Sequence, residues 1–124
     1  MKPLLLQPSL LNADATGGTT VAKFVAQRLD ESNAESIGRL LFDLVDRLGR
    51  HKLHLDLDAV EYLTSVVLGK FIGLNKKVRA VGGELCLFNV RPQVYEIFEV
   101  THLIKVLDIR PKDPAQDTAH VASA

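Results

Sequence analysis

Thr64 and Ser65 place two hydroxyl groups where a predicted strand ends and a predicted helix begins. The first turn of a helix leaves backbone N–H groups unpaired and carries the positive end of the helix dipole. A hydroxyl at this point has two interpretations. It caps the helix, as serine and threonine commonly do, or it accepts a phosphate, whose roughly 1.5 to 2 negative charges a helix start can accommodate. On the residue types alone, the capping role is favoured over the phosphate-accepting role.

The other reactive side chains form no recognisable catalytic set. The four histidines show no metal-ligand spacing with cysteine or carboxylates, and no glycine-rich phosphate loop occurs. His54 with Asp56 and Asp58 comes nearest to a site, but alternation along a strand explains these residues as its solvated face. Cys86 lies in an apolar run, which predicts a small core residue instead of a nucleophile. We therefore expect no enzyme, no cofactor and no metal.

Composition restricts the classes of partner and the cellular compartment that we expect for this protein. The 124 residues suit one domain, 47% of them are apolar, and the single cysteine rules out an internal disulfide. Fifteen basic residues balance fifteen acidic ones, so no broad positive field is expected and nucleic acid is not predicted as a partner. No apolar run approaches the roughly 20 residues that span a bilayer. We expect a cytoplasmic protein with no membrane partner.

The first part of the chain predicts a hairpin. Residues 1–18 are expected to be an N-terminal arm or edge strand, because an edge position tolerates Pro8. Gly17 and Gly18 mark a turn. Residues 19–28 are rich in residues that favour strands, and they predict the second strand of the pair.

Two amphipathic helices surround a central strand. Asp30, Ser32 and Asn33 are capping residues before a stripe at helical spacing made by Ile37, Leu40, Leu41, Leu44, Val45 and Leu48, and Gly49 ends that helix. Residues 52–57 alternate with period two and predict a strand with its leucines on one face. A second helix begins after Ser65 and ends at Gly82 and Gly83, where the chain reversal requires positive φ.

The last third of the chain adds one strand, one helix and a short final strand. Residues 84–90 are almost continuously apolar, which is typical of a strand covered on both faces. Pro92 starts a third helix, residues 105–109 predict the last strand, and residues 110–124 a disordered tail. The order β-β-α-β-α-β-α-β predicts an α/β fold with a mixed, mainly parallel sheet of about four to five strands flanked by amphipathic helices.

From about Thr20 to Ile109 the chain resembles the STAS family, which includes the bacterial anti-sigma factor antagonists, and 19–109 is the predicted domain. The resemblance depends on several short patterns in the right order. They are residues 29–30 followed by Ala34, then 53–57, 60–63, 68–69, 82–85, 89–94 and 97–105. Family members with a working switch usually carry Asp-Ser-[Ser/Thr]-Gly at the strand-to-helix junction. This chain keeps the serine as Ser65, with Thr64 before it and Val66 and Val67 after it.

The resemblance implies a function and a set of contact residues. The unphosphorylated domain would bind an anti-sigma factor, often an ATP-using serine kinase, and phosphorylation of Ser65 by that kinase would release it. The implied partner-binding residues are Asp30, Thr64, Ser65, Val66, Val67 and Leu68. Asp30 has a second interpretation as the cap of the first helix, and the sequence does not separate the two.

Three other functions stay open on the sequence. A constitutive STAS scaffold or transport-accessory module needs no phosphate, and Val66 with Val67 favours it because they make the first helical turn stiffer and more apolar. A small enzyme would use His54 and Asp56. A module that binds nucleoside phosphates is the fourth hypothesis.

Overall fold

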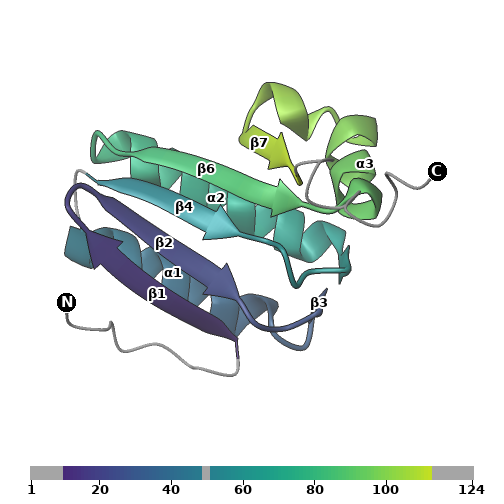
Figure 1. Ribbon diagram of the computed structural model, residues 1–124, viewed down its shortest axis with the longest axis horizontal. Helices are drawn as coiled ribbons and strands as arrows, with labels where there is room; N and C mark the ends of the chain where they lie inside the picture. The colour runs from purple at the N-terminus through teal and green to yellow at the C-terminus, as the bar shows by residue number, and fades with distance from the viewer. Residues whose placement is uncertain (1–9, 49–50, 113–124) are drawn as a thin grey trace, which may run out of the picture.

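The computed structural model describes residues 10–48 and 51–112 (Figure 1). The elements, in chain order, are β1 (Leu11–Thr16), β2 (Thr19–Phe24), β3 (Arg28–Leu29), α1 (Ala34–Leu48), β4 (Lys52–Asp56), β5 (Tyr62–Leu63), α2 (Ser65–Ala80), β6 (Glu84–Val90), α3 (Pro92–Val100), the 3₁₀ turn η1 (Leu103–Lys105) and β7 (Asp108–Pro111). All the predicted helices are present. The short strands β3 and β5 and the turn η1 were not predicted.

The main sheet has five strands in the order β1-β2-β4-β6-β7. The hairpin β1–β2 is antiparallel, as the glycine pair predicted, and all later neighbours are parallel. Parallel neighbours need crossover helices, and α1 and α2 supply them on one face of the sheet (Figure 1). The predicted α/β fold with a mixed, mainly parallel sheet is therefore confirmed.

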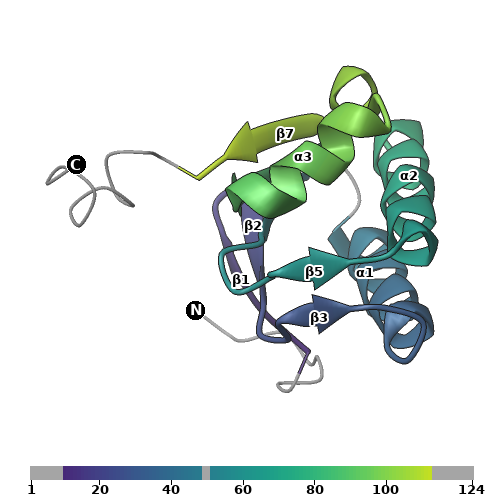
Figure 2. The ribbon, with the colours of Figure 1, turned by 90° about the vertical axis from the view of Figure 1, so that its right-hand side faces the viewer.

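The core lies between this face of the sheet and the two helices. Leu53 and Leu55 of β4 are fully buried, and Phe24 of β2 meets Phe71 of α2 edge to face with 6.0 Å between ring centroids. The helix α3 packs instead against β5, β7 and η1, beside the sheet (Figure 2). None of the helices in the described segments has the length and apolar character to cross a bilayer.

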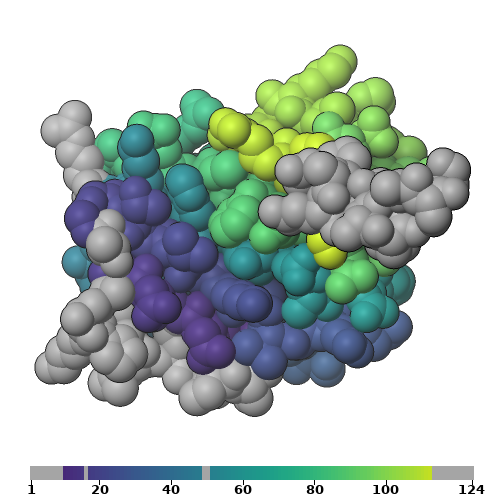
Figure 3. Space-filling view, in the orientation of Figure 1, coloured from purple at the N-terminus to yellow at the C-terminus, as the bar shows by residue number. Residues whose placement is uncertain are grey.

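The opposite face of the sheet carries no helix among the described residues, and Figure 3 shows this face. The prediction that β6 is covered on both faces was wrong, because its side chains alternate between buried and half-buried. Cys86 is accordingly half-buried on the open face and is not a core residue. Partial burial, and secondarily the neighbouring Asp108 carboxylate, raise the pKa of its thiol, which disfavours the reactive thiolate.

The end of the domain also differs from the prediction. Residues 103–105 form η1 instead of entering a strand, because His102 adopts a left-handed conformation with φ of 61° and the following backbone bonds close a turn. The strand β7 begins only at Asp108, where the chain reaches Cys86 of β6. Arg110 and Pro111, assigned to the tail by sequence, belong to β7. The predicted arm before residue 10, the stop at Gly49 and the tail beyond residue 112 lie outside the described residues.

The turn after α2 uses its two glycines for different reasons. Gly82 has a φ of 80°, as predicted for this reversal. Gly83 is required by space instead, since a Cβ there would lie 2.5 Å from the backbone oxygen of His51. This contact locks the start of β6 against the start of β4.

Candidate functional site

A second, two-stranded parallel sheet brings the predicted site residues together. In β3 and β5, Arg28 pairs with Tyr62 and Leu29 with Leu63, and the N–H of Thr64 donates to the Leu29 carbonyl at 3.1 Å. Parallel strands end at the same edge, so the residues that follow them are neighbours (Figure 2). Asp30 therefore lies beside the start of α2, although the two segments are far apart in sequence.

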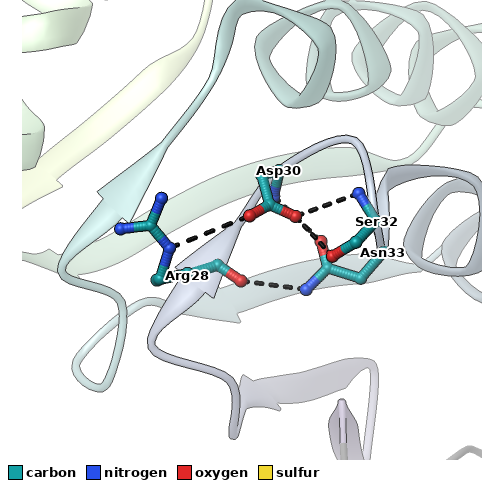
Figure 4. A network of polar contacts seen from close by, with 4 residues as sticks. All are labelled: Arg28, Asp30, Ser32 and Asn33. Carbon is teal, nitrogen blue, oxygen red and sulfur yellow. Dashed lines mark hydrogen bonds and ion pairs between the residues drawn. The ribbon is translucent and has the colours of Figure 1, made fainter.

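Asp30 organises the loop between β3 and α1 (Figure 4). Its Oδ1 accepts hydrogen bonds from the Ser32 hydroxyl at 2.5 Å and the Ser32 N–H at 3.0 Å, while Oδ2 faces the Arg28 Nε at 3.8 Å. The hydroxyl and N–H of Ser32, more than the Arg28 charge, hold the pKa of Asp30 below its usual range. The side chain is 24% exposed. The loop thus fixes a carboxylate that stays ionised at neutral pH and remains accessible.

Asp30 is not the cap of α1, so that interpretation was wrong. The chain first turns over residues 31–33, and the helix begins at Ala34 with Asn33 in the capping position. The Asn33 side chain reaches backwards, accepting from the Asp30 N–H and donating to the Arg28 carbonyl, both at 2.9 Å. The polar side chains before α1 therefore build the Asp30 loop, while the N–H of Ala34 donates to the backbone carbonyl of Asp30 at 2.8 Å.

Thr64 occupies the N-cap position of α2 with extended backbone angles, φ −105° and ψ 170°, yet its side chain makes no capping bond. The Thr64 Oγ1 is buried and has no hydrogen-bond partner in the described part of the chain. Ser65 is the first residue of the helix and is exposed. Neither hydroxyl acts as a cap, so the first turn of α2 keeps its unpaired N–H groups and Ser65 presents its hydroxyl to solvent.

The three apolar residues after Ser65 divide between surface and core. Val66 is 41% exposed, whereas Val67 is fully buried and Leu68 is 6% exposed. Sequence reasoning placed all three in the partner contact. Because a helix turns about 100° per residue, consecutive side chains cannot share one face. Val67 and Leu68 anchor the start of α2 in the core, and Val66 alone extends the accessible surface around Ser65.

Two further pairs flank this surface and were not predicted. The Arg28 guanidinium lies 4.3 Å from the centre of the Tyr62 ring, and Tyr62 is 42% exposed. The Lys70 Nζ meets Glu35 Oε1 at 2.7 Å and links the second turn of α2 to the first turn of α1. This bond lowers the pKa of Glu35. Little in the sequence indicates these two pairs, since their residues lie in or near two very short strands that have no periodic pattern. The site is an accessible hydroxyl among fixed charges and an exposed aromatic ring.

The rival enzyme hypothesis has weaker geometry. His54 contacts Phe88 edge to face at 6.2 Å on the open face of the sheet. The Asp56 Oδ1 accepts from the Asp58 N–H at 2.9 Å and the Asn89 Nδ2 at 3.2 Å. These bonds fix the loop after β4 and leave Asp56 in a structural role. No group of three or more histidine, cysteine or acidic residues within 10–48 and 51–112 is arranged to hold a metal ion.

Comparison with known proteins identifies the family and the fold. The family model of the STAS domain matches residues 11–115. The chain belongs to the STAS family. The resemblance predicted from sequence is therefore confirmed.

Several anti-sigma factor antagonists are similar to this chain. The anti-sigma-B factor antagonist of Listeria monocytogenes is 36% identical over 58 residues, which cover 47% of this chain and 51% of the relative. The chain thus spans about half the length of this relative. An anti-sigma-factor antagonist (STAS) domain protein from Planctomyces limnophilus matches with a TM-score of 0.74 at 23% identity, covering 92% of this chain and 98% of that one. Bacillus SpoIIAA in its phosphorylated form gives 0.62 at 18% identity, covering 88% and 98%.

Proposed function

We propose that this STAS domain is an anti-sigma factor antagonist whose binding is controlled at Ser65. The unphosphorylated domain binds an anti-sigma factor through Asp30, Thr64, Ser65 and Val66. The partner, a serine kinase that uses ATP, phosphorylates Ser65 and is released. The chain is the substrate of that transfer and not its catalyst, and the cytoplasm is where such a partner would meet it.

One observation carries this proposal: the exposed Ser65 hydroxyl stands on the open first turn of α2 beside the ionised Asp30. A protein kinase needs an accessible hydroxyl, and Ser65 satisfies that need without unfolding of the domain. The names of the Listeria relative and of the SpoIIAA structure support the same function, since one is an anti-sigma factor antagonist and the other exists in a phosphorylated form.

Electrostatics explains how a phosphate at Ser65 would change binding. It adds roughly 1.5 to 2 negative charges and three acceptor oxygens, which the free N–H groups of α2 can hold in place. The surface then carries two adjacent anionic groups, the phosphate and the Asp30 carboxylate. A partner that docks against Asp30 with a cation or hydrogen-bond donors loses its fit to this enlarged charge.

The second candidate is a constitutive STAS scaffold or transport-accessory module. It is favoured by Thr64 and Val66, which stand where switching family members usually carry an acid and a hydroxyl. Val66 is 41% exposed and adds apolar area that binding would bury without any phosphate. Under this function Ser65 is unmodified in the cell.

The test is intact-mass and phosphopeptide analysis of the protein purified from its native host, with co-purified proteins identified in parallel. A phosphate on Ser65 and an ATP-binding anti-sigma factor among the partners are expected. Ser65 unmodified under all growth conditions, together with a membrane complex as partner, would establish the scaffold function instead.

A further inference from the structure

A hollow of about 440 Å³ lies at the other end of α2, between the end of that helix and the starts of β6 and β7. In Figure 1 this end of the sheet is opposite to β3 and the start of α2. Its walls include Asn75, Arg79, Glu84 and Asp108, and residues 82–83 close it without side chains. The volume falls within the range of small-molecule sites, roughly 300–1,000 Å³.

Asn75 is the unusual member of this wall. It is only 7% exposed, and its amide has no hydrogen-bond partner anywhere in the described segments. Its polar atoms are not fully enclosed by protein and line the hollow. Because these atoms face the open hollow, a ligand there could hydrogen-bond to the amide directly in place of solvent.

The charges of the wall restrict the ligand. Arg79 and Glu84 form no ion pair with any described residue. Asp108 differs, because Arg110 donates to both of its carboxylate oxygens, at 2.9 and 3.2 Å. With respect to the residues that the structure describes, the hollow therefore offers one unpaired cation, one unpaired carboxylate and one unpaired amide. Its complement is a small molecule that carries an anion and a cation together.

We propose that this hollow binds a small zwitterion of the α-amino acid class. The ligand carboxylate pairs with the planar guanidinium of Arg79. The ligand ammonium pairs with the Glu84 carboxylate, and Asn75 hydrogen-bonds to the remaining polar atoms. The site is separate from Ser65, so it stands whether or not Ser65 is phosphorylated.

The experiment is a titration of the ¹⁵N-labelled chain with each of the twenty common L-amino acids, following the side-chain amide signals of Asn75 by NMR. At least one amino acid is expected to shift these signals to saturation in the millimolar range. Two derivatives of that amino acid serve as controls. The N-acetyl derivative lacks the ammonium group, and the C-terminal amide derivative lacks the carboxylate. Each should bind about tenfold more weakly, equivalent to ~1.4 kcal/mol.

Variants locate the site. Arg79→Gln and Glu84→Gln change exposed side chains and should each weaken binding about tenfold, while Arg39→Gln on α1 should leave it unchanged. Asn75→Leu should abolish binding, and its thermal unfolding shows whether it is folded. No saturable shift with any amino acid would overturn the proposal. Equal binding of the neutralised derivatives, or unchanged binding by the Arg79 and Glu84 variants, would also overturn it.

Discussion

The two ends of α2 are built in opposite ways. At its start, Thr64 leaves the first turn uncapped by any side chain and Ser65 is exposed. At its end, the N–H groups of residues 81–83 all return to carbonyls of the last turn, and Gly83 sits against the His51 backbone. The start of the helix leaves backbone N–H groups available, whereas the backbone N–H groups at its end are bonded within the turn.

This difference separates residues that determine function from those that determine stability. Substitutions of the exposed Ser65 and Val66 should change binding with little effect on folding, because these two side chains are not packed in the core. Substitutions in the turn after α2 should change folding, because two backbone segments meet there without room for a side chain. The predictions below test that division.

The largest effect is expected for Gly83→Val. The new Cβ would lie 2.5 Å from the His51 oxygen, and backbone cannot move aside easily. We expect a loss of about 3 kcal/mol in the free energy of unfolding, measured with urea. An unchanged midpoint would show that this end of α2 is not locked.

Gly69→Ala is the matched control for that variant. Gly69 lies in the same helix, and nothing is within 4 Å of an added Cβ. Alanine has the higher helix propensity, so this change should stabilise the protein by about 1 kcal/mol. Opposite signs at Gly83 and Gly69 would confirm that space, and not glycine content, sets the effect.

Ser65→Asp should act on binding instead. A carboxylate beside Asp30 should weaken binding of the anti-sigma factor at least about tenfold, or ~1.4 kcal/mol. The unfolding free energy should hold or rise slightly, since an anion suits a helix start. Calorimetry with the purified partner measures the first effect. Ser65→Ala, which adds no charge, should bind like the natural chain, and equal affinities for the two variants would reject the charge switch.

Thr64→Val should have a still smaller effect. The Thr64 hydroxyl is buried and unpartnered within the described residues, and it makes no capping bond. Replacing it with a methyl of similar shape should change stability by less than about 0.5 kcal/mol, or raise it slightly. A loss near the ~1 kcal/mol typical of a removed cap, seen in thermal unfolding, would show that the hydroxyl caps α2 in solution.

The smallest expected effect concerns the Asp30 loop and pH. The lowered pKa of Asp30 means that its ionised form is favoured by folding. This contribution is present above the ordinary carboxyl pKa and is lost as pH falls through the lowered value. Ser32→Ala removes the main cause, so NMR titration of the Asp30 carboxyl should show its pKa moved upward. Ser36→Ala, which leaves that bond intact, should not move it.

Sequence patterns predicted the long elements well, because burial on one side leaves a periodic signal. The leucines of β4 and the stripe from Ile37 to Leu48 gave the correct strand and helix. The same reasoning failed for β6, where half-buried Cys86 and Phe88 on the open face imitate the pattern of a strand covered on both sides. A run of apolar residues in the sequence does not show what fraction of each side chain is exposed to solvent.

The amino-acid sequence by itself determined the order of elements, the fold class and the serine at the start of α2, since each depends on local periodicity or on a local motif. Tertiary structure alone decided that Asp30 lies beside Ser65. That proximity rests on two-residue strands, which are too short to leave a periodic signal and form only when distant segments meet. Burial of Val67 and exposure of Val66 were likewise decided by how α2 rotates onto the sheet.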